Sequence, residues 1–204
     1  MEDYTLDSDN IFSNPLFLVA LEVELPKTEF PALNIQYTGV GKINATYFAL
    51  KAIKLYKPTI VINFGSAGSL NKNISGLVQV EEVFQRDMDV RKLGFRLGET
   101  PFEDFIDPLY VQDFAFSNKD PYFKRVSCST GDNFVTEFPE LSSDIVDMEL
   151  YAIAKVCKYE NLPLLAWKYI SDGADGNSSR DWKKNVKIGV TEFKSKVLNF
   201  FERS

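Results

Sequence analysis

The sequence contains no histidine and only two cysteines. Without histidine, Ser-His-Asp catalysis, Cys-His catalysis and all imidazole-ligated metal sites are excluded. Acid–base chemistry must then depend on carboxylates, lysine, tyrosine or cysteine. The cysteines, Cys128 and Cys157, are not closely spaced, which argues against a structural zinc site and a disulfide framework.

Long apolar runs and basic clusters are missing as well. No stretch approaches the roughly 20 apolar residues of a membrane span. The opening residues, MEDYTLDSDN, are acidic and polar, unlike a signal peptide. The net charge is −6 and no run of Lys or Arg occurs, which argues against binding to a nucleic-acid backbone. We therefore expect a soluble, cytoplasmic protein that binds neither membranes nor nucleic acid.

The remaining composition is that of an ordinary globular chain. Its 204 residues, 45% hydrophobic and 25% charged, fit one domain with one core. No internal repeat or linker divides it. We expect an N-terminal tail over residues 1–15 and a single domain over 16–204.

Short apolar runs bounded by turn residues predict strands, and apolar residues at helical spacing predict helices between them. This alternation predicts an α/β fold. In the helix expected at 42–55, the spacing of Ile43, Tyr47, Leu50 and Ile53 predicts the packed face. Strands are expected at 16–25, 33–38, 59–63, 78–84, 124–130 and 164–170, and helices at 42–55, 149–161 and after the loop that follows Asp172.

Two glycine-rich segments interrupt this pattern. Gly39 to Lys42 is predicted to turn the chain into a helix, either as a plain tight turn or with backbone N–H groups free for a polar ligand. Residues 64–69, FGSAGS, follow the strand expected at 59–63, and their glycines are predicted to let the backbone approach a ligand. This second segment is not a P-loop, because no Gly-Lys-Ser/Thr follows.

Carboxylates stand where strands and helices meet. Asp172 follows a buried strand, and ligands of open α/β sheets bind at the carboxyl ends of strands. Glu149 follows Met148 at the start of a helix, where an acid also stabilises the helix dipole. Glu22 and Glu24 close the first strand and are expected on one side of it. A structural cap for Asp172 and solvated charges for Glu22 and Glu24 are the alternatives to one shared site.

Taken in order, these segments resemble the nucleoside phosphorylase/nucleosidase superfamily, and within it the 5′-methylthioadenosine/S-adenosylhomocysteine nucleosidases. The resemblance covers most of residues 16–200. It implies a single-domain, three-layer α/β/α fold around a central mixed, twisted sheet. The matching motifs are ALEVE at 20–24, TGVGKINA at 38–45, KPTIVINFGSAGSL at 57–70, TGDNFV at 130–135, VDMELYAIAKVC at 146–157 and ISDGAD at 170–175.

The resemblance also implies roles for individual residues. Asp172 matches the general acid that protonates the purine, and Glu24 matches the carboxylate that activates water. Glu149 matches the residue that binds the ribose hydroxyls, with Met148 against the sugar. The remaining implied substrate-binding residues are Ser66, Ala67, Gly68, the base-stacking Phe134 and Val135, whose backbone reads the base edge.

A second subunit completes the site in this family. The positions that correspond to Val90, Leu93 and Phe95 come from the neighbouring subunit and cover the 5′ end of the substrate. The resemblance therefore implies a homodimer that binds a small-molecule purine nucleoside.

The chemistry agrees with the residues available. Cleavage of an N-glycosidic bond releases a poor leaving group, so protonation of the purine assists it. A carboxylate near the sugar favours the positive charge that develops there, and a second carboxylate takes a proton from water, as in O-glycoside hydrolysis. No metal and no cofactor is required.

Phosphate is the alternative nucleophile. Phosphorylases of the superfamily hold it with arginines, whereas this chain has Asn63-Phe64 and Glu24-Leu25-Pro26 at the corresponding places. A phosphate would meet Glu24 without guanidinium donors. Hydrolysis is therefore predicted over phosphorolysis.

The sequence departs from the family at several positions. Asp147 replaces a common glutamate, Lys168 a common arginine and Ser69 a common glycine, and the loop after Gln85 lacks a common histidine. Other substrates thus stay open: adenosine, a deoxynucleoside, a futalosine-type compound or a nucleotide. Three alternative functions also stay open: those of a purine nucleoside phosphorylase, of a 2-deoxyribosyltransferase-like enzyme and of a non-catalytic nucleoside-binding protein.

Overall fold

The predicted strands meet in one mixed sheet. The computed structural model describes residues 11–103, 108–111, 123–174 and 178–198, and within these ranges the sheet has eight strands. These are β1 (Pro15–Val19), β2 (Ile35–Tyr37), β3 (Ile60–Ser69), β4 (Leu77–Gln85), β5 (Leu109–Tyr110), β6 (Arg125–Thr130), β7 (Ile145–Asp147) and β8 (Leu164–Asp172).

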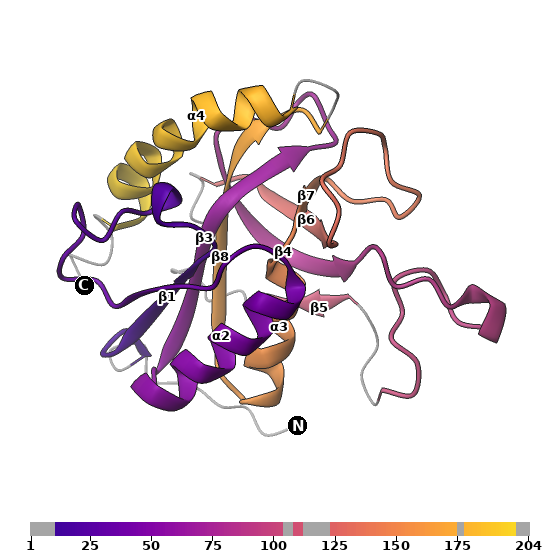
Figure 1. The fold of residues 1–204 in the computed structure, drawn as a ribbon, viewed down its shortest axis with the longest axis horizontal. Helices are drawn as coiled ribbons and strands as arrows, with labels where there is room; N and C mark the ends of the chain where they lie inside the picture. Colours follow the sequence, from indigo (N-terminus) through magenta and orange to yellow (C-terminus); the bar gives the residue numbers. More distant parts are fainter. Residues whose placement is uncertain (1–10, 104–107, 112–122, 175–177, 199–204) are drawn as a thin grey trace.

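The sheet has two halves: one is an open set of parallel strands, and in the other the strands pair around in a closed ring. Strand β1 pairs in parallel with β2 and β3, and β3 pairs in parallel with β8 along most of its length. Strands β7, β6 and β4 then lead back to β8 through parallel and antiparallel pairs. Because β3 and β8 belong to both halves, they run through the middle of the sheet, and their carboxyl ends point toward the start of α4 (Figure 1).

Helices cover both faces of the sheet. Helices α2 (Lys42–Tyr56) and α3 (Leu150–Tyr159) pack on one face, and α4 (Ser178–Phe193), continued by the short π-helix η3 (Lys194–Leu198), packs on the other (Figure 1). The central strands are apolar on both sides, as two covered faces require. The three-layer α/β/α architecture with a mixed sheet is therefore confirmed.

Strand β1 shows how one short sequence serves two cores. Leu16 and Leu18 belong to the cluster beneath α2 and α3, whereas Phe17 and Val19 belong to the cluster beneath α4. Successive side chains of a strand point to opposite faces, so a continuous apolar run fills both. On the α4 side, Phe193 stacks on Phe64 of β3 with ring centroids 4.1 Å apart.

The first strand is shorter than predicted. It ends at Val19, and residues 22–24 form the 3-10 helix η1 (Glu22–Glu24). The expectation that Glu22 and Glu24 lie on the same side is therefore wrong: Glu22 is exposed, and Glu24 is only 4% exposed. The backbone N–H of Leu21 donates to Glu24 Oε2 at 3.1 Å, which turns this carboxylate inward.

Residues 64–69 continue the strand that was predicted to end at residue 63. Strand β3 runs from Ile60 through both glycines to Ser69, because β8 pairs with it up to Gly68. An irregularity in that pairing lies between Ala67 and Gly68. The ligand-facing backbone predicted here is thus part of the sheet.

The packed face of α2 also differs from the prediction. Ile43 and Tyr47 are 82% and 61% exposed, while Ala45, Ala49 and Ala52 are buried with Ile53. Small alanines allow α2 to approach α3 and β1 closely. Ile43 and Tyr47 are left on the outer surface, whereas Leu50 and Ile53 pack on the core as predicted.

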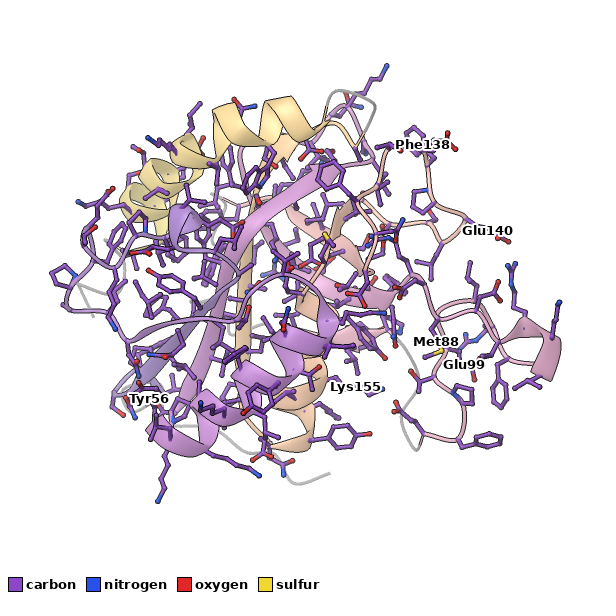
Figure 2. The ribbon with its side chains drawn as sticks, in the orientation of Figure 1. Tyr56, Met88, Glu99, Phe138, Glu140 and Lys155 are labelled. Atoms are coloured by element: carbon purple, nitrogen blue, oxygen red, sulfur yellow. The ribbon has the colours of Figure 1, made fainter. Side chains whose placement is uncertain are left out.

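Residues 87–103 form an arm that projects from the sheet after β4 and contains the 3-10 helix η2 (Arg91–Leu93) (Figure 1). Its far end is held by Arg91, which forms ion pairs with Asp89 and with Glu140 of the loop before β7. Its near end is held by an ion pair of 2.6 Å between Glu103 and Lys155 of α3. Figure 2 shows Met88 and Glu99 on the arm, and Glu140 and Lys155 on its neighbours.

The ends of the predicted domain fall only partly within the described ranges. Residues 11–15 were predicted as part of the tail, but Ile11 is buried in the core and Pro15 begins β1, while Ser13 and Asn14 are exposed. Most of the segment 105–124, for which no regular structure was predicted, lies outside the described residues. No helix in the described part of the chain is both long enough and apolar enough to span a membrane.

Candidate active site

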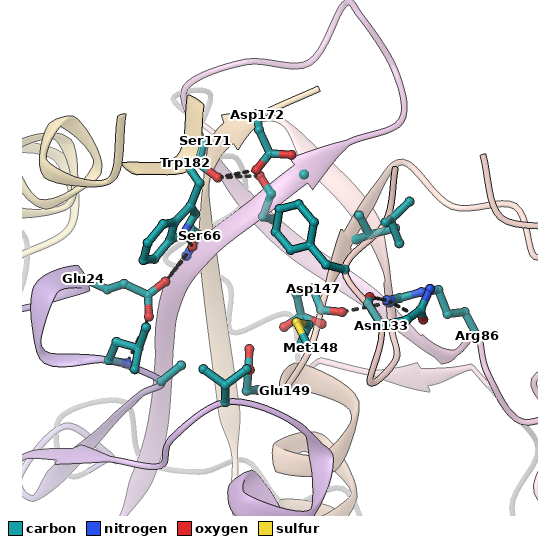
Figure 3. A pocket seen from close by; sticks show the side chains of 18 residues that line it. Glu24, Ser66, Arg86, Asn133, Asp147, Met148, Glu149, Ser171, Asp172 and Trp182 are labelled. Carbon is teal, nitrogen blue, oxygen red and sulfur yellow. Dashed lines mark hydrogen bonds between the residues drawn. The ribbon is translucent and has the colours of Figure 1, made fainter. Parts of the chain in front are cut away.

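A cavity of about 240 Å³ opens at the carboxyl ends of β3 and β8 (Figure 3). Its walls come from η1, the turn before α2, β3, the loop after β6, the start of α3 and α4. Among the lining residues are all nine that the sequence analysis placed in catalysis or substrate binding within one subunit. The lining residues used below are Leu21, Glu24, Val40, Ser66, Ala67, Gly68, Arg86, Asn133, Phe134, Val135, Asp147, Met148, Glu149, Ser171, Asp172 and Trp182.

Asp172 is the last residue of β8, and its carboxylate is held from two sides. Ser171 Oγ donates to Asp172 Oδ2 at 2.8 Å, and the backbone N–H of Ala174 donates to Oδ1 at 3.0 Å. Gly68 is the pairing partner of Asp172 on β3. A Cβ atom at position 68 would lie 2.9 Å from Asp172 Oδ1, 3.1 Å from Ala174 Cβ and 3.2 Å from a methyl of Val146. The carboxylate therefore occupies space that only glycine leaves open.

Glu24 faces the cavity from η1, across from Asp172. Its Oε1 accepts two hydrogen bonds from Ser66, one from the backbone N–H at 2.8 Å and one from Oγ at 2.6 Å. Its Oε2 accepts the N–H of Leu21 at 3.1 Å. The carboxylate is thus fixed by three donors although it is almost fully buried.

Glu149 is the residue that caps the start of α3, and it reaches the glycine turn before α2. Its Oε1 accepts the backbone N–H of Gly41 at 2.9 Å. The next N–H, of Lys42, donates to Asp132 Oδ1 at 2.7 Å. The turn therefore presents its N–H groups to two protein carboxylates. Gly41 has φ of 91°, a backbone conformation that favours glycine.

Burial raises the pKa of Glu149 to about 7, and the nearby Asp147 carboxylate adds to this effect, while Lys168 and the Gly41 N–H oppose it. A carboxyl group whose pKa is raised on folding stabilises the fold below its unfolded value, and that stabilisation is lost as the pH rises through the folded value. Stability contributed by Glu149 is therefore present near pH 4.5 and lost by about pH 8.

Glu149→Gln is expected to remove this pH dependence. The unfolding free energy of the variant relative to wild type should rise by about 2 kcal/mol between pH 5 and pH 8, since each pKa unit corresponds to about 1.4 kcal/mol. Urea unfolding of both proteins across this pH range measures the change. Titrating groups that both proteins contain contribute equally and cancel in the difference. Parallel stability profiles for the two proteins would contradict the assignment.

A buried ion pair lies beneath the cavity. Lys168 Nζ of β8 is 2.8 Å from Asp147 Oδ2, and both side chains are almost fully buried. Asp147 also accepts from Thr130 Oγ1 at 2.5 Å and from the Leu150 N–H at 2.9 Å. Burial raises the pKa of Asp147, but the ammonium of Lys168 outweighs it, so the net shift is downward. Burial lowers the pKa of Lys168, but the nearby acidic groups, above all Asp147, outweigh it and raise the pKa overall. Both groups are charged.

Lys168→Met is expected to destabilise the protein by about 3 kcal/mol, because it leaves the Asp147 carboxylate buried and uncompensated. Lys168→Met combined with Asp147→Asn removes both charges and should recover part of this loss. Lys158→Met, on the exposed side of α3, is the matched control and should change stability by less than about 0.5 kcal/mol. Urea unfolding measures all three. A double variant no more stable than Lys168→Met alone would contradict this account.

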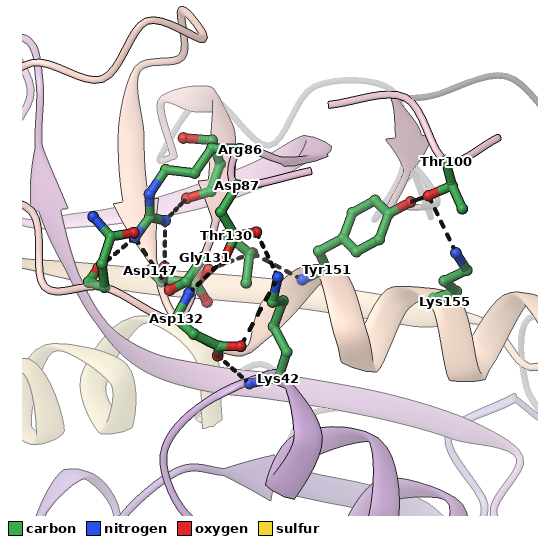
Figure 4. Close-up of polar contacts among 12 residues, drawn as sticks. Lys42, Arg86, Asp87, Thr100, Thr130, Gly131, Asp132, Asp147, Tyr151 and Lys155 are labelled. Carbon is green, nitrogen blue, oxygen red and sulfur yellow. Dashed lines mark hydrogen bonds and ion pairs between the residues drawn. The ribbon is translucent and has the colours of Figure 1, made fainter. Parts of the chain in front are cut away.

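A buried guanidinium shapes the loop after β6 (Figure 4). Arg86 Nη1 donates to the carbonyl oxygens of Ser129 and Asp147, each at 2.8 Å, and Nη2 donates to those of Gly131 at 3.1 Å and Asn133 at 2.5 Å. Burial lowers the pKa of Arg86, and the acidic groups around it oppose the shift. One side chain therefore satisfies four backbone carbonyls and holds the loop against the sheet.

That loop carries the residues predicted to hold the base. Phe134 lines the cavity and is 48% exposed, while Val135 is buried. The free Phe134 face and the fixed backbone of Val135 are suited to stacking on a flat ring and to hydrogen bonding along its edge. Met148 also lines the cavity, next to Glu149 (Figure 3).

Three predicted residues do not join the cavity within this chain. Val90, Leu93 and Phe95 lie on the arm, and none of them lines the cavity. Leu93 is 69% exposed, and Phe95 packs edge-to-face on Phe102. Their placement is consistent with a role in contact with another molecule, and it excludes a role in this chain's own cavity as it stands.

Other cavity residues were not predicted. Arg86 was not singled out, although its position directly after a buried strand was an available signal. Trp182 was not singled out either, and no motif in the sequence marks it. Leu21, Val40 and Asn133 flank motif residues and carried no separate signal. Within the ranges that the structure describes, no cluster of three or more Cys, Asp or Glu residues could hold a metal ion.

The chain is similar in sequence and in structure to known proteins. The family model of the phosphorylase superfamily matches residues 31–202. A 5′-methylthioadenosine/S-adenosylhomocysteine nucleosidase of Buchnera aphidicola subsp. Acyrthosiphon pisum (strain Tuc7) is 33% identical, over 74% of this chain and 72% of its own. The corresponding nucleosidase of Helicobacter pylori has a similar structure, with a TM-score of 0.83, 19% identity and coverage of 93% of this chain and 98% of that chain. A futalosine hydrolase mutant of Helicobacter pylori strain 26695 is also similar in structure, with a TM-score of 0.76 and 20% identity. The match covers 88% of this chain and 95% of that chain. At these low sequence identities, the two structures support the fold alone.

Proposed function

Because this chain belongs to the phosphorylase superfamily and to the family of the 5′-methylthioadenosine/S-adenosylhomocysteine nucleosidases, we propose that it hydrolyses the N-glycosidic bond of a purine nucleoside of that type. The observation that carries the proposal is the presence of three carboxylates, Asp172, Glu24 and Glu149, in the wall of one cavity. A protein that only binds nucleosides has less need of all three.

The reaction divides among these carboxylates. Asp172 donates a proton to the purine, the bond between the sugar and the base breaks, and its electron pair stays with the base. Water adds to the anomeric carbon and gives its proton to Glu24, so that the products are free base and free sugar. Glu149 binds the ribose hydroxyls. In its ionised form it also faces the positive charge that develops on the sugar.

Water is favoured over phosphate by the charges near Glu24. Among the described residues that line the cavity, the one guanidinium is Arg86, and it is committed to backbone carbonyls. Lys168 is paired with Asp147. A phosphate beside Glu24 would therefore meet a negative charge without a forked donor to offset it.

The proposed assembly is a homodimer in which Val90, Leu93 and Phe95 of the partner subunit cover the 5′ end of the substrate. Two observations support this assembly. Leu93 is exposed on an arm that projects from its own subunit. Ile43 and Tyr47 are exposed apolar residues of α2, and the turn before this helix lines the cavity through Val40. Large exposed apolar side chains of this kind favour an interface.

Release of free purine from a panel of nucleosides, with and without phosphate, tests the function. The panel contains methylthioadenosine, S-adenosylhomocysteine, adenosine, inosine, 2′-deoxyadenosine and a futalosine-type compound. We expect base release without phosphate, with the first two as preferred substrates. Release only with phosphate would make the protein a phosphorylase, and binding without release would make it a nucleoside-binding protein.

A further inference from the structure

The indole of Trp182 is connected to Glu24 through a single hydroxyl group. Trp182 Nε1 donates to Ser66 Oγ at 2.7 Å, and Ser66 Oγ lies 2.6 Å from Glu24 Oε1 (Figure 3). Building on the proposed hydrolysis, we propose that Trp182 is a positioning residue for the water-activating carboxylate and acts through Ser66.

The direction of this chain of hydrogen bonds follows from the donors available. An indole N–H can only donate, so Ser66 Oγ must accept from it. The hydroxyl proton of Ser66 is then left for Glu24, which as a carboxylate can only accept. Trp182 thereby selects one rotation of a hydroxyl group that would otherwise be free to turn toward other acceptors or toward water.

The consequence is a carboxylate held in one orientation. Oε1 of Glu24 is occupied by the N–H and the hydroxyl of Ser66, and Oε2 accepts one backbone N–H from Leu21. The remaining acceptor capacity of Oε2 is then what a water molecule can use. Positioning of this kind matters because small errors in the placement of a catalytic group lower the rate strongly.

The helix that carries Trp182 reinforces the arrangement. Helix α4 packs against η1, which carries Glu24, and against β3, which carries Ser66. The three members of the chain therefore come from three elements in mutual contact. Trp182 also lines the cavity, so a simple wall for the substrate is the competing role.

Trp182→Phe removes the N–H and keeps an aromatic ring. We expect kcat to fall about tenfold with KM within about twofold of wild type, as for a lost hydrogen bond that orients a catalytic group. Loss of a wall would instead raise KM. Replacement of Trp182 by 3-benzothienylalanine, which has the shape of tryptophan without the N–H, should give the same fall in kcat and answers the case in which the Phe variant folds poorly.

Ser66→Ala supplies the decisive comparison. If Trp182 acts through Ser66, adding Trp182→Phe to Ser66→Ala should change kcat by less than about twofold, because the hydrogen bond has already lost its acceptor. Independent effects of the two substitutions would overturn the inference. Trp167→Phe is the matched control: Trp167 lies in the core beneath α4 and does not line the cavity, and its kcat should stay at the wild-type value.

Failure of this inference is separable from failure of the proposed function. A wild-type enzyme that releases base, together with a Trp182→Phe variant of unchanged kcat, overturns the inference alone. A wild-type protein that releases no base from any nucleoside, with or without phosphate, overturns both.

Discussion

Asp172→Asn is expected to leave the fold intact and to lower kcat at least about 10²-fold, the usual contribution of a general acid. Asparagine keeps the shape of the side chain but has no proton to give to the purine. Its Oδ1 can still accept the N–H of Ala174. Its amide can donate to Ser171 Oγ, since the Ser171 hydroxyl already has a second acceptor, the carbonyl oxygen of Ala67 at 3.3 Å.

Steady-state base release by the variant, together with its urea unfolding curve, measures this effect. The unfolding midpoint should stay close to wild type because every hydrogen bond at position 172 has a substitute. A variant that folds normally and turns over at nearly the wild-type rate would remove Asp172 from the role of acid.

Glu24→Gln is expected to lower kcat by about 10²-fold or more, because the amide cannot take a proton from water. Its effect differs from that of Asp172→Asn in one respect. Both oxygens of Glu24 accept backbone N–H groups, from Ser66 and from Leu21, so either orientation of the amide places a donor against a donor. Some loss of stability should therefore accompany the loss of activity.

Glu22→Gln is the matched control for this variant. Glu22 lies on the same short helix and carries the same charge, but it is exposed. Its kcat should equal that of wild type. If both substitutions lowered kcat to the same degree, the effect would stem from the net charge of η1 and Glu24 would lose its assigned role.

The sequence predicted the central strands well because their apolar runs are long enough to be distinctive. Val61 and Leu164 belong to strands that are buried on both faces, and such strands have no competing polar pattern. The carboxylates were predicted by their position after these strands. Their placement around one cavity depended on the family resemblance, since spacing alone does not bring Glu24 and Asp172 together.

The prediction for α2 was right for Leu50 and Ile53, which pack on the core, and wrong for Ile43 and Tyr47 for a physical reason. Helical spacing identifies a face by hydrophobicity, and it selected Ile43 and Tyr47 over the alanines. The sheet side required small residues, because α2 lies close to its neighbours, and Ala45 and Ala49 fill that role. A surface that serves a second molecule has the same apolar signature as a core, and one sequence cannot separate the two.

The position of Arg86 after a buried strand could have marked it, but the roles of Trp182 and Arg86 could not be predicted because distant partners set them. Trp182 bonds to Ser66, 116 positions away in sequence, and Arg86 bonds to carbonyls 43 to 61 positions away. Neither residue type announces such a role locally. These contacts depend on how β3, β6 and α4 meet, which is tertiary information.

The narrow space at Gly68 has an evolutionary consequence. A glycine codon becomes an alanine codon by one nucleotide change, and a methyl group at this position would overlap Asp172 Oδ1, only 2.9 Å away. The same methyl group would lie 3.1 Å from Ala174 Cβ and 3.2 Å from a methyl of Val146, so these neighbours leave it no room either. A single nucleotide change, at a residue that performs no chemistry itself, is thus enough to displace the carboxylate that we assign as the acid.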